Sequence, residues 1–278
     1  MRLLAISDLH LGSPTNRDAL AELGDYPEDW LIVAGDVAES FQRIGDGLAA
    51  LRRRFAKVIW VPGNHELWSL PGIEGELRGE ARYQGLVDLA RAQDVLTPED
   101  PWPIWHGEGG PVRIVPIFTL YDYSFAPPGL APAEVIAWAG ETNIHPVDEV
   151  LLHPDPHPNR VAWCRDRLAR TEARLAALEP GLPSILVSHW PLREDLVRIP
   201  RVPRFAPWCG TTATRHWPER FGAIACVYGH LHVRGRRWLD GIRFEEVSLG
   251  YPRQWQPERG MAAYVRQILP LVAEPEAP

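Results

Sequence analysis

The sequence predicts a layered α/β fold, and three observations lead to it. Short apolar runs alternate with stretches whose apolar residues fall at helical spacing. Strand and helix follow one another along most of the chain, which is the pattern of layered α/β proteins. Polar residues come directly after the apolar runs, as they do where ligands approach the carboxyl ends of strands in an open sheet. A chain of 278 residues is long enough to bury one large core of this kind.

The N-terminal third contains three predicted buried strands, at 3–7, 31–34 and 58–61, and a helical pattern with turns through about Trp30. Ser40 is placed to cap the helix that follows. The apolar positions of that helix lie at helical spacing: Phe41, Ile44, Leu48, Leu51 and Phe55. A helix at about 82–92 and a strand at 112–119 come next.

Two proline-rich segments interrupt the alternation, at about 123–159 and 192–221. Because proline is disfavoured inside regular elements, we expect both segments to run over the surface, the first with a short helix near 132–139. Between them the pattern predicts a helix over 160–178 and a strand over 185–187. We therefore predict one domain over 1–278, with the two segments as surface insertions.

The last part of the chain begins with a buried strand over 223–228, which Gly229 stops. A β-hairpin turning at Asp240-Gly241 is expected next. The run from Ser248 to Trp255 follows a strand, and we place it, as a hypothesis, near the mouth of the site described below. The tail from Leu269 is expected to be loose.

Composition excludes several classes of protein. A net charge of −7 argues against a general nucleic-acid binder, and Lys57 is the only lysine, so the many arginines reflect a compositional bias and are weak evidence of function. No apolar run approaches the roughly 18 residues of a membrane span, and no secretory leader is visible. Cys164, Cys209 and Cys226 predict buried thiols in a reducing compartment, so we expect a cytoplasmic protein.

Five predicted strand ends or turns carry residues that bind metals. In chain order they read Asp8-x-His10, Gly35-Asp36, Gly63-Asn64-His65-Glu66, His189 and Gly229-His230-x-His232. Each block alone is a weak signal, but the series resembles the motif of the calcineurin-like metallophosphoesterases in content and order. The resemblance implies a fold of two central β-sheets sandwiched by helices, with the proline- and arginine-rich insertions as a cap.

The resemblance also implies a site for two divalent metal ions. Asp8, His10 and His232 would hold one ion; Asn64, His189 and His230 would hold the other; Asp36 would bridge them. Two ions about 3.5–4 Å apart neutralise a phosphoester and generate hydroxide near neutral pH. Oxygen and imidazole ligands without thiolate favour Mn, Fe or Zn.

His65 is the residue next to the proposed ligand Asn64, so its side chain points in another direction and we expect it to face the substrate. The resemblance implies that this histidine protonates the leaving oxygen or stabilises the charge on it. Two interpretations of Glu39 remain open. It can orient His65 as a supporting carboxylate, or it can be an acid that suits the first turn of a helix.

The sequence predicts the class of substrate less precisely than it predicts the metal ligands. The second block lacks the arginine and glycine of the serine/threonine protein phosphatases, and the Gly-His-x-His block is shared with phosphodiesterase-like members, so a phosphodiester is favoured. Alternatives are a phosphomonoesterase, a protein phosphatase and a catalytically silent scaffold of the same fold. A nuclease is disfavoured by the acidic balance.

Arginines and aromatic residues gather in the second proline-rich segment, where Arg201 and Arg204 are candidate substrate-binding residues. The segment is either a lid over an anionic substrate or a plain solvated loop. A fitting substrate carries a second phosphate or an acidic protein surface, as a nucleotide or a phosphopantetheinylated carrier protein does. His153 and His157, between prolines, are interpreted as part of a surface loop.

Overall fold

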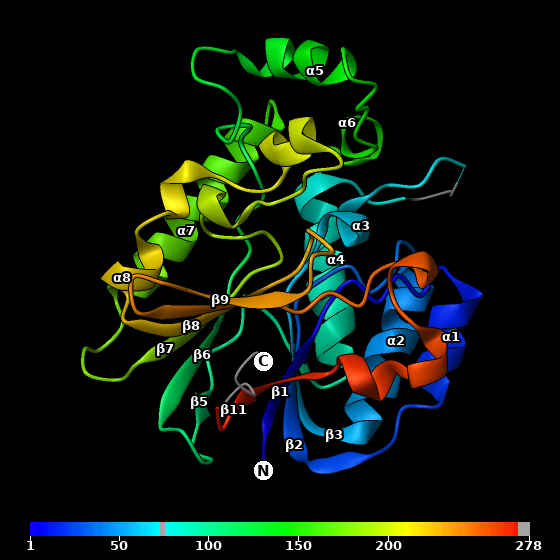
Figure 1. Ribbon diagram of the computed structural model, residues 1–278, viewed down its shortest axis with the longest axis vertical. Coiled ribbons are helices and arrows are strands. Elements are labelled where there is room, and N and C mark those ends of the chain that lie inside the picture. Colours follow the sequence, from blue (N-terminus) through cyan, green and yellow to red (C-terminus); the bar gives the residue numbers. More distant parts are fainter. Residues whose placement is uncertain (73–75, 272–278) are drawn as a thin grey trace, which may run out of the picture.

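Two β-sheets lie face to face at the centre of the molecule in a computed structural model that describes residues 1–72 and 76–271 (Figure 1). The first sheet has five strands in the order β11-β1-β2-β3-β4. Its strands are β1 (Leu3–Ile6), β2 (Tyr26–Val33), β3 (Phe55–Trp60), β4 (Val95–Leu96) and β11 (Arg266–Leu269). β1 to β4 pair in parallel, and β11 pairs antiparallel with β1.

The second sheet has six strands in the order β5-β6-β7-β8-β10-β9. They are β5 (Ile104–Trp105), β6 (Val112–Pro116), β7 (Ser184–Val187), β8 (Ala223–Tyr228), β9 (Gly235–Leu239) and β10 (Ile242–Glu246). β6, β7, β8 and β10 are parallel neighbours, so their carboxyl ends share one edge. β9 and β10 form the antiparallel hairpin that the Asp240-Gly241 turn predicts.

The strand sequences explain why the sheets stack. Successive side chains of a strand point to opposite faces, so a strand that is apolar throughout buries both. In β1, Leu3 and Ala5 lie in the core between the sheets, whereas Leu4 and Ile6 lie in the core under the helices. The layer between the sheets also contains Ile32 and Ile59 of the first sheet and, from the second, residues such as Ile114, Ile185 and Ala225.

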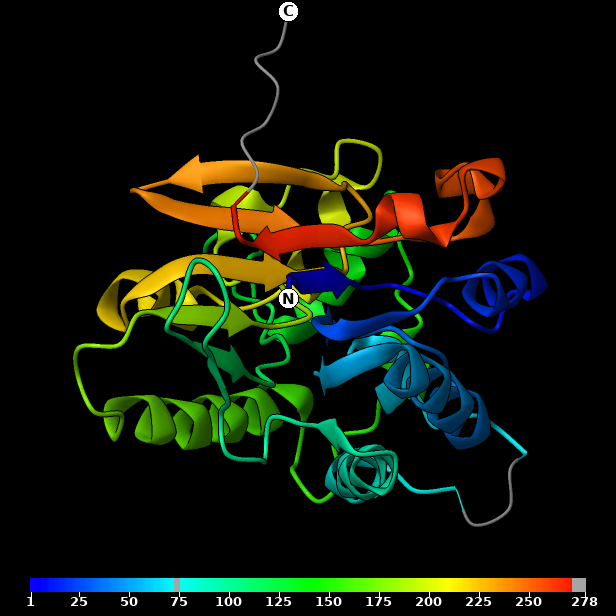
Figure 2. The ribbon, with the colours of Figure 1, turned by 90° about the horizontal axis from the view of Figure 1, so that it is seen from below.

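Helices cover the outer faces of the sheets, and Figure 2 shows this layering from below. The helices are α1 (Pro14–Ala21), α2 (Phe41–Arg54), α3 (Asn64–Leu67), α4 (Gly79–Ala92), α5 (Pro132–Gly140), α6 (Asp148–Leu151), α7 (Arg160–Ala176) and α8 (Trp217–Arg220). Ser40 caps α2 as predicted, accepting a hydrogen bond from the Arg43 amide at 3.4 Å. α7 and α8 cover the second sheet, where Leu175 and Trp217 pack into its outer core.

Two expectations about the chain are wrong. The helical pattern expected through Trp30 ends at Ala21, and β2 begins at Tyr26, because strand pairing with Phe55 and Lys57 outweighs local preference there. Leu269 is not loose but ends strand β11, whose Ile268 and Leu269 are buried. The rest of the expected loose tail, residues 272–278, lies outside the described residues.

The two proline-rich segments contain short helices and, among the described residues, no strand. The first carries α5 and α6; the second carries η1 (Glu194–Leu196), η2 (Pro203–Trp208), η3 (Thr212–Thr214) and α8. The segments contact each other, since Arg204 pairs with Glu141 and Trp208 Nε1 donates to Glu149 Oε1 at 2.7 Å. We call the two segments together the cap, and Figure 1 shows α5 at the end of the molecule opposite the N-terminus. That residues 1–278 form one domain stays a proposal.

The three cysteines are buried and unpaired, as predicted. Among the described residues no helix is both long and apolar enough to cross a membrane. The helices η4 (Pro252–Gln254), η5 (Pro257–Arg259) and η6 (Met261–Tyr264) connect β10 to β11.

Candidate metal centre

The carboxyl ends of strands from both sheets meet at one place. β1, β2 and β3 lead to Asp8, Asp36 and Asn64 in the first sheet; β7 and β8 lead to His189 and His230 in the second. The sheets are joined there, because the Ser7 amide donates to the Val247 carbonyl at 3.1 Å and the Leu249 amide donates to the Ser7 carbonyl at 2.8 Å. Side chains separated by more than 200 positions therefore face one another.

The backbone at the site is unusual. Five of the seven predicted ligands are non-glycine residues in the left-handed region, with φ of 54° at Asp8, 41° at His10, 56° at Asp36, 70° at His230 and 53° at His232. This region costs non-glycine residues free energy and persists only where the surroundings impose it, often at functional sites. The turns after the strands are thus shaped to aim these side chains inward.

The motif glycines allow the turns to approach the ligands closely. A β-carbon at Gly63 would collide with Oδ1 of Asp36, and one at Gly229 would collide with Oδ2 of Asp8 and Oγ of Ser7. No larger residue fits at either position without displacing a ligand carboxylate.

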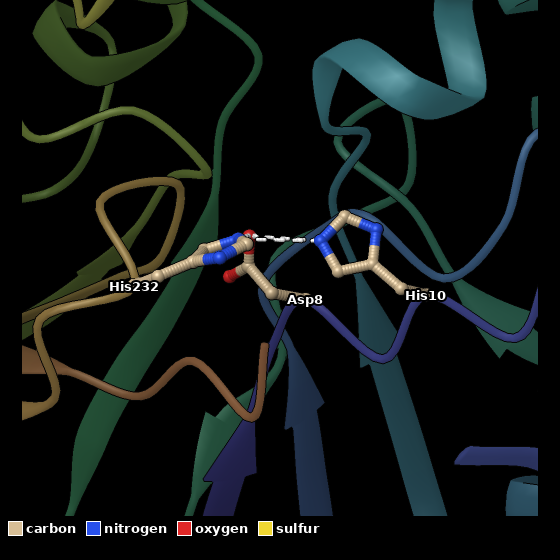
Figure 3. A group of neighbouring side chains, drawn as sticks. All are labelled: Asp8, His10 and His232. Carbon is tan, nitrogen blue, oxygen red and sulfur yellow. Dashed lines mark hydrogen bonds and ion pairs between the residues drawn. The ribbon is translucent and has the colours of Figure 1, made fainter. Parts of the chain in front are cut away.

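Asp8, His10 and His232 form the first group of candidate ligands, and Figure 3 shows the two imidazoles beside the Asp8 carboxylate. His232 Nε2 lies 2.9 Å from Asp8 Oδ1 and 3.2 Å from His10 Nε2. Ser248 Oγ donates to Asp8 Oδ2 at 2.7 Å, which leaves Asp8 Oδ1 as the oxygen available to a metal ion. His232 Nδ1 donates to Gln254 Oε1 at 2.7 Å, which leaves the lone pair of Nε2 facing the group.

Asn64, His189 and His230 form the second group. Asn64 Oδ1, His189 Nε2 and His230 Nδ1 lie 3.2 Å from one another in all three pairs. Ligand atoms about 2.0–2.2 Å from an ion are separated by about 3 Å, so this triangle has the size of one face of a coordination shell. His189 Nδ1 donates to the Ala34 carbonyl at 2.8 Å, which leaves the lone pair on Nε2.

Asp36 lies between the groups. Its Oδ1 is 3.5 Å from His189 Nε2 of the second group, and its Oδ2 is 4.0 Å from His10 Nε2 of the first. One oxygen therefore faces each group, so the Asp36 carboxylate lies between the two candidate positions for an ion.

The charges at the site fit cations. Burial raises the pKa of the Asp36 carboxyl well above its ordinary value, and Asp8 and Glu66 nearby add to the rise. Burial lowers the pKa of His189 to about 4 and those of His10 and His230 well below the ordinary value, so these imidazoles are neutral and free to bind a metal. Buried carboxylates beside neutral imidazoles favour a positive charge between them.

His65 faces the same space but makes different contacts. Its Nδ1 donates to Glu39 Oε1 at 3.1 Å, and its Nε2 lies 3.9 Å from Asp36 Oδ2. The hydrogen bond from His65 lowers the pKa of Glu39, so the carboxylate is the charged partner. Glu39 thus lies in the position from which its carboxylate can orient the His65 ring. A part for Glu39 in catalysis stays a proposal.

The cap contributes a residue that sequence reasoning missed. Asp148, buried at the start of α6, accepts hydrogen bonds at Oδ1 from Asn64 Nδ2 at 2.9 Å and from Trp68 Nε1 at 2.7 Å. Holding the amide nitrogen turns Asn64 Oδ1 toward His189 and His230. No local pattern marks Asp148, because it lies 84 positions from Asn64.

Three further residues support the site although the sequence predicted no role for them: Glu66, Tyr251 and Gln254. Glu66 is part of the predicted motif, and its carboxylate accepts from the backbone amides of Asp36 at 2.9 Å and Val37 at 2.7 Å, which fixes the turn after β2. Tyr251 and Gln254 lie in the run from Ser248 to Trp255. The hypothesis that this run returns to the site is confirmed, because Gln254 contacts His232 and the Tyr251 hydroxyl lies 3.3 Å from His65 Nε2.

The candidate substrate-binding arginines lie on the cap. Phe205 of η2 stacks near His230, with ring centroids 5.8 Å apart, so the second segment reaches the metal-ligand group. Arg201 is exposed, and no carboxylate of the described residues pairs with it. Arg204 is engaged, because it pairs with Glu141, donates to the Trp138 carbonyl and lies 4.7 Å from the Trp138 ring. His157 lies 3.9 Å from Asp166 and is not brought to the site.

A sequence model of the calcineurin-like phosphoesterase family matches residues 1–234, which include every predicted ligand. The chain belongs to the calcineurin-like phosphoesterases. Over 270 residues this phosphoesterase is 50% identical to the acyl-carrier-protein phosphodiesterase PptH of Mycobacterium tuberculosis, and the match covers 96% of this chain and 83% of that protein. The crystal structure of phosphopantetheinyl hydrolase (PptH) from the same organism is similar with a TM-score of 0.93 at 49% identity, covering 99% of this chain and 98% of that one.

These similarities confirm three predictions. The phosphoesterase has the expected fold of two sheets flanked by helices, it is an enzyme, and its reaction is phosphoester hydrolysis of the metallophosphoesterase type; the relative PptH is named as a phosphodiesterase. The family is metal-dependent, and the site described above has the groups to hold metal.

Proposed function

We propose that this phosphoesterase releases phosphopantetheine from an acyl carrier protein by hydrolysing the phosphodiester to the carrier's serine. The observation that carries the proposal is 50% identity, over nearly the whole chain, to a protein named for that activity. Such a substrate is a diester with a small organic group on one side and a protein on the other.

We further propose that the site binds two divalent ions, of Mn, Fe or Zn. Asp8, His10 and His232 hold one ion; Asn64, His189 and His230 hold the other; Asp36 bridges them. Three observations support this assignment: the ligand atoms of the first group lie 2.9–4.0 Å apart, those of the second lie 3.2 Å apart, and Asp36 lies between the two groups. When bound, the ions supply charge neutralisation and a water that ionises near neutral pH.

The chain's own residues supply the proton. Serine is a poor leaving group as an alkoxide, so its oxygen needs a proton as the bond to phosphorus breaks. His65 Nε2 faces the site while Glu39 holds Nδ1, so a protonated His65 is oriented to donate from Nε2. We assign His65 as the general acid and Glu39 as the residue that positions it.

The cap provides a surface for the protein half of the substrate. Arg198 and Arg201 are exposed in the second segment, a few residues before Phe205 packs beside His230. Such arginines attract an acidic protein surface and increase its rate of encounter. We propose that Arg201 contacts the carrier directly and that Arg204 acts mainly by holding the cap together. The buried free thiols are consistent with a cytoplasmic enzyme, which we also propose.

Mass spectrometry of a phosphopantetheinylated carrier protein tests the proposal. After incubation with the Mn-reconstituted enzyme, the carrier should lose the mass of the prosthetic group and leave an unmodified serine. An enzyme that hydrolyses bis(p-nitrophenyl) phosphate but leaves the carrier intact would exclude the carrier substrate. A clear preference for p-nitrophenyl phosphate would favour a phosphomonoesterase.

A further inference from the structure

Tyr251 is held at the site by contacts on three sides. Its backbone amide donates to Gln254 Oε1 at 2.8 Å, the same oxygen that accepts from His232. Its ring stacks on the His10 ring, with centroids 4.2 Å apart and planes 15° apart, and meets the His232 ring edge-on at 5.2 Å. Two ligands of one proposed ion thus fix the orientation of the phenol.

The hydroxyl of Tyr251 points to the atom of His65 that faces the substrate. The distance from the hydroxyl to His65 Nε2 is 3.3 Å, and no other hydrogen bond of this hydroxyl is found among the described residues. Glu39 occupies the opposite nitrogen of His65. The two groups are therefore close enough for a single substrate oxygen to lie within hydrogen-bonding distance of both.

The site needs donors at this place. The atoms that surround the proposed ions are acceptors: carboxylate oxygens, an amide oxygen and imidazole lone pairs. The phosphoryl oxygens of a hydrolysing diester are acceptors as well, and they interact most strongly with fixed donors in the transition state. The hydroxyl of a tyrosine carries one proton that it can donate in a hydrogen bond.

We propose that Tyr251 is a catalytic residue whose hydroxyl donates a hydrogen bond to the phosphoryl group of the substrate, beside His65. Tyr251 lies outside residues 1–234, so the segment between β10 and β11 completes a site whose proposed metal ligands all lie within the family match. The inference rests on phosphodiester hydrolysis and not on the identity of the carrier substrate.

Tyr251→Phe tests the role of the hydroxyl, because it removes one oxygen and keeps the stacked ring. In the Mn-reconstituted enzyme, kcat for bis(p-nitrophenyl) phosphate should fall roughly 10- to 100-fold, the order expected for one lost donor to a developing charge. Inorganic phosphate, titrated calorimetrically, should bind more weakly to the variant. Metal content and melting temperature should equal those of the parent.

Tyr264→Phe is the matched control. Tyr264 belongs to the same segment, and its hydroxyl accepts from the Gln256 amide at 2.9 Å. This variant should keep kcat and phosphate affinity. If Tyr251→Phe retains both within twofold, the proposal is overturned and the ring serves only to pack against His10. The artificial diester keeps this result independent of whether the enzyme acts on a carrier protein.

Discussion

At the scale of single residues, the site depends on how each imidazole is oriented. The Ala34 carbonyl holds Nδ1 of His189, Gln254 holds Nδ1 of His232, and Glu39 holds Nδ1 of His65. In the first two residues the free nitrogen faces the neighbouring ligand atoms, whereas in His65 it faces Tyr251 and Asp36. In each of these three rings the partner on Nδ1 therefore fixes the direction in which Nε2 points.

His65→Asn should retain the metals and lower kcat by roughly 10²–10⁴, the usual effect of losing a positioned proton donor. The loss should be smaller for nitrophenyl esters than for alkyl esters, because nitrophenolate leaves without a proton. Steady-state kinetics on a matched pair of diesters measures the difference. Equal losses on both would mean that His65 stabilises phosphoryl charge and does not protonate the leaving group.

Asp148→Ala should weaken metal binding at the group of Asn64, His189 and His230 by about 10- to 100-fold, since the Asn64 amide loses the partner that orients it. Chelator competition with Mn should show one weakened ion and one nearly unchanged.

Asp148→Asn keeps an acceptor oxygen and should restore much of the affinity. Asp122→Ala is the control, because Asp122 accepts from Thr211 within the cap and contacts no ligand. Parent-like titration of Asp148→Ala would show that Asn64 needs no support.

At the scale of elements, the parallel strands position the ligands and the cap adds to them. Most of this was predictable, because buried strands are apolar throughout and their carboxyl ends carried all seven proposed ligands and His65. The contributions of Asp148 and Tyr251 could not be predicted in this way. They depend on long-range packing of segments whose sequences carry no periodic signal, and β11 was missed for the same reason.

Arg201→Ala should raise KM for the carrier protein with little change in kcat and none toward bis(p-nitrophenyl) phosphate, because Arg201 is exposed and lies away from the chemistry. Arg204→Ala should instead loosen the cap. The Arg204–Glu141 pair is solvent-exposed on the glutamate side, so its loss costs at most about 1 kcal/mol and the enzyme should still fold. Unchanged KM in Arg201→Ala would leave that arginine as ordinary surface.

At the scale of the whole molecule, the two-sheet architecture and the metal site are one feature. Each sheet alone supplies only part of a ligand set: Asp8, His10, Asp36 and Asn64 follow the first sheet, and His189, His230 and His232 follow the second. Each proposed ion therefore takes ligands from both sheets. The apolar layer between the sheets keeps the two edges together, so metal binding and the packing of that layer should stabilise one another.

Metal content per chain tests the central claim most directly. After reconstitution with excess Mn and removal of free ion, elemental analysis should find two ions per chain in the intact enzyme. Asp36→Asn should fall clearly below two, because the proposed bridge contacts both ions, whereas His10→Ala should lose chiefly one. A stoichiometry of one or less in the fully reconstituted parent enzyme would contradict the binuclear site.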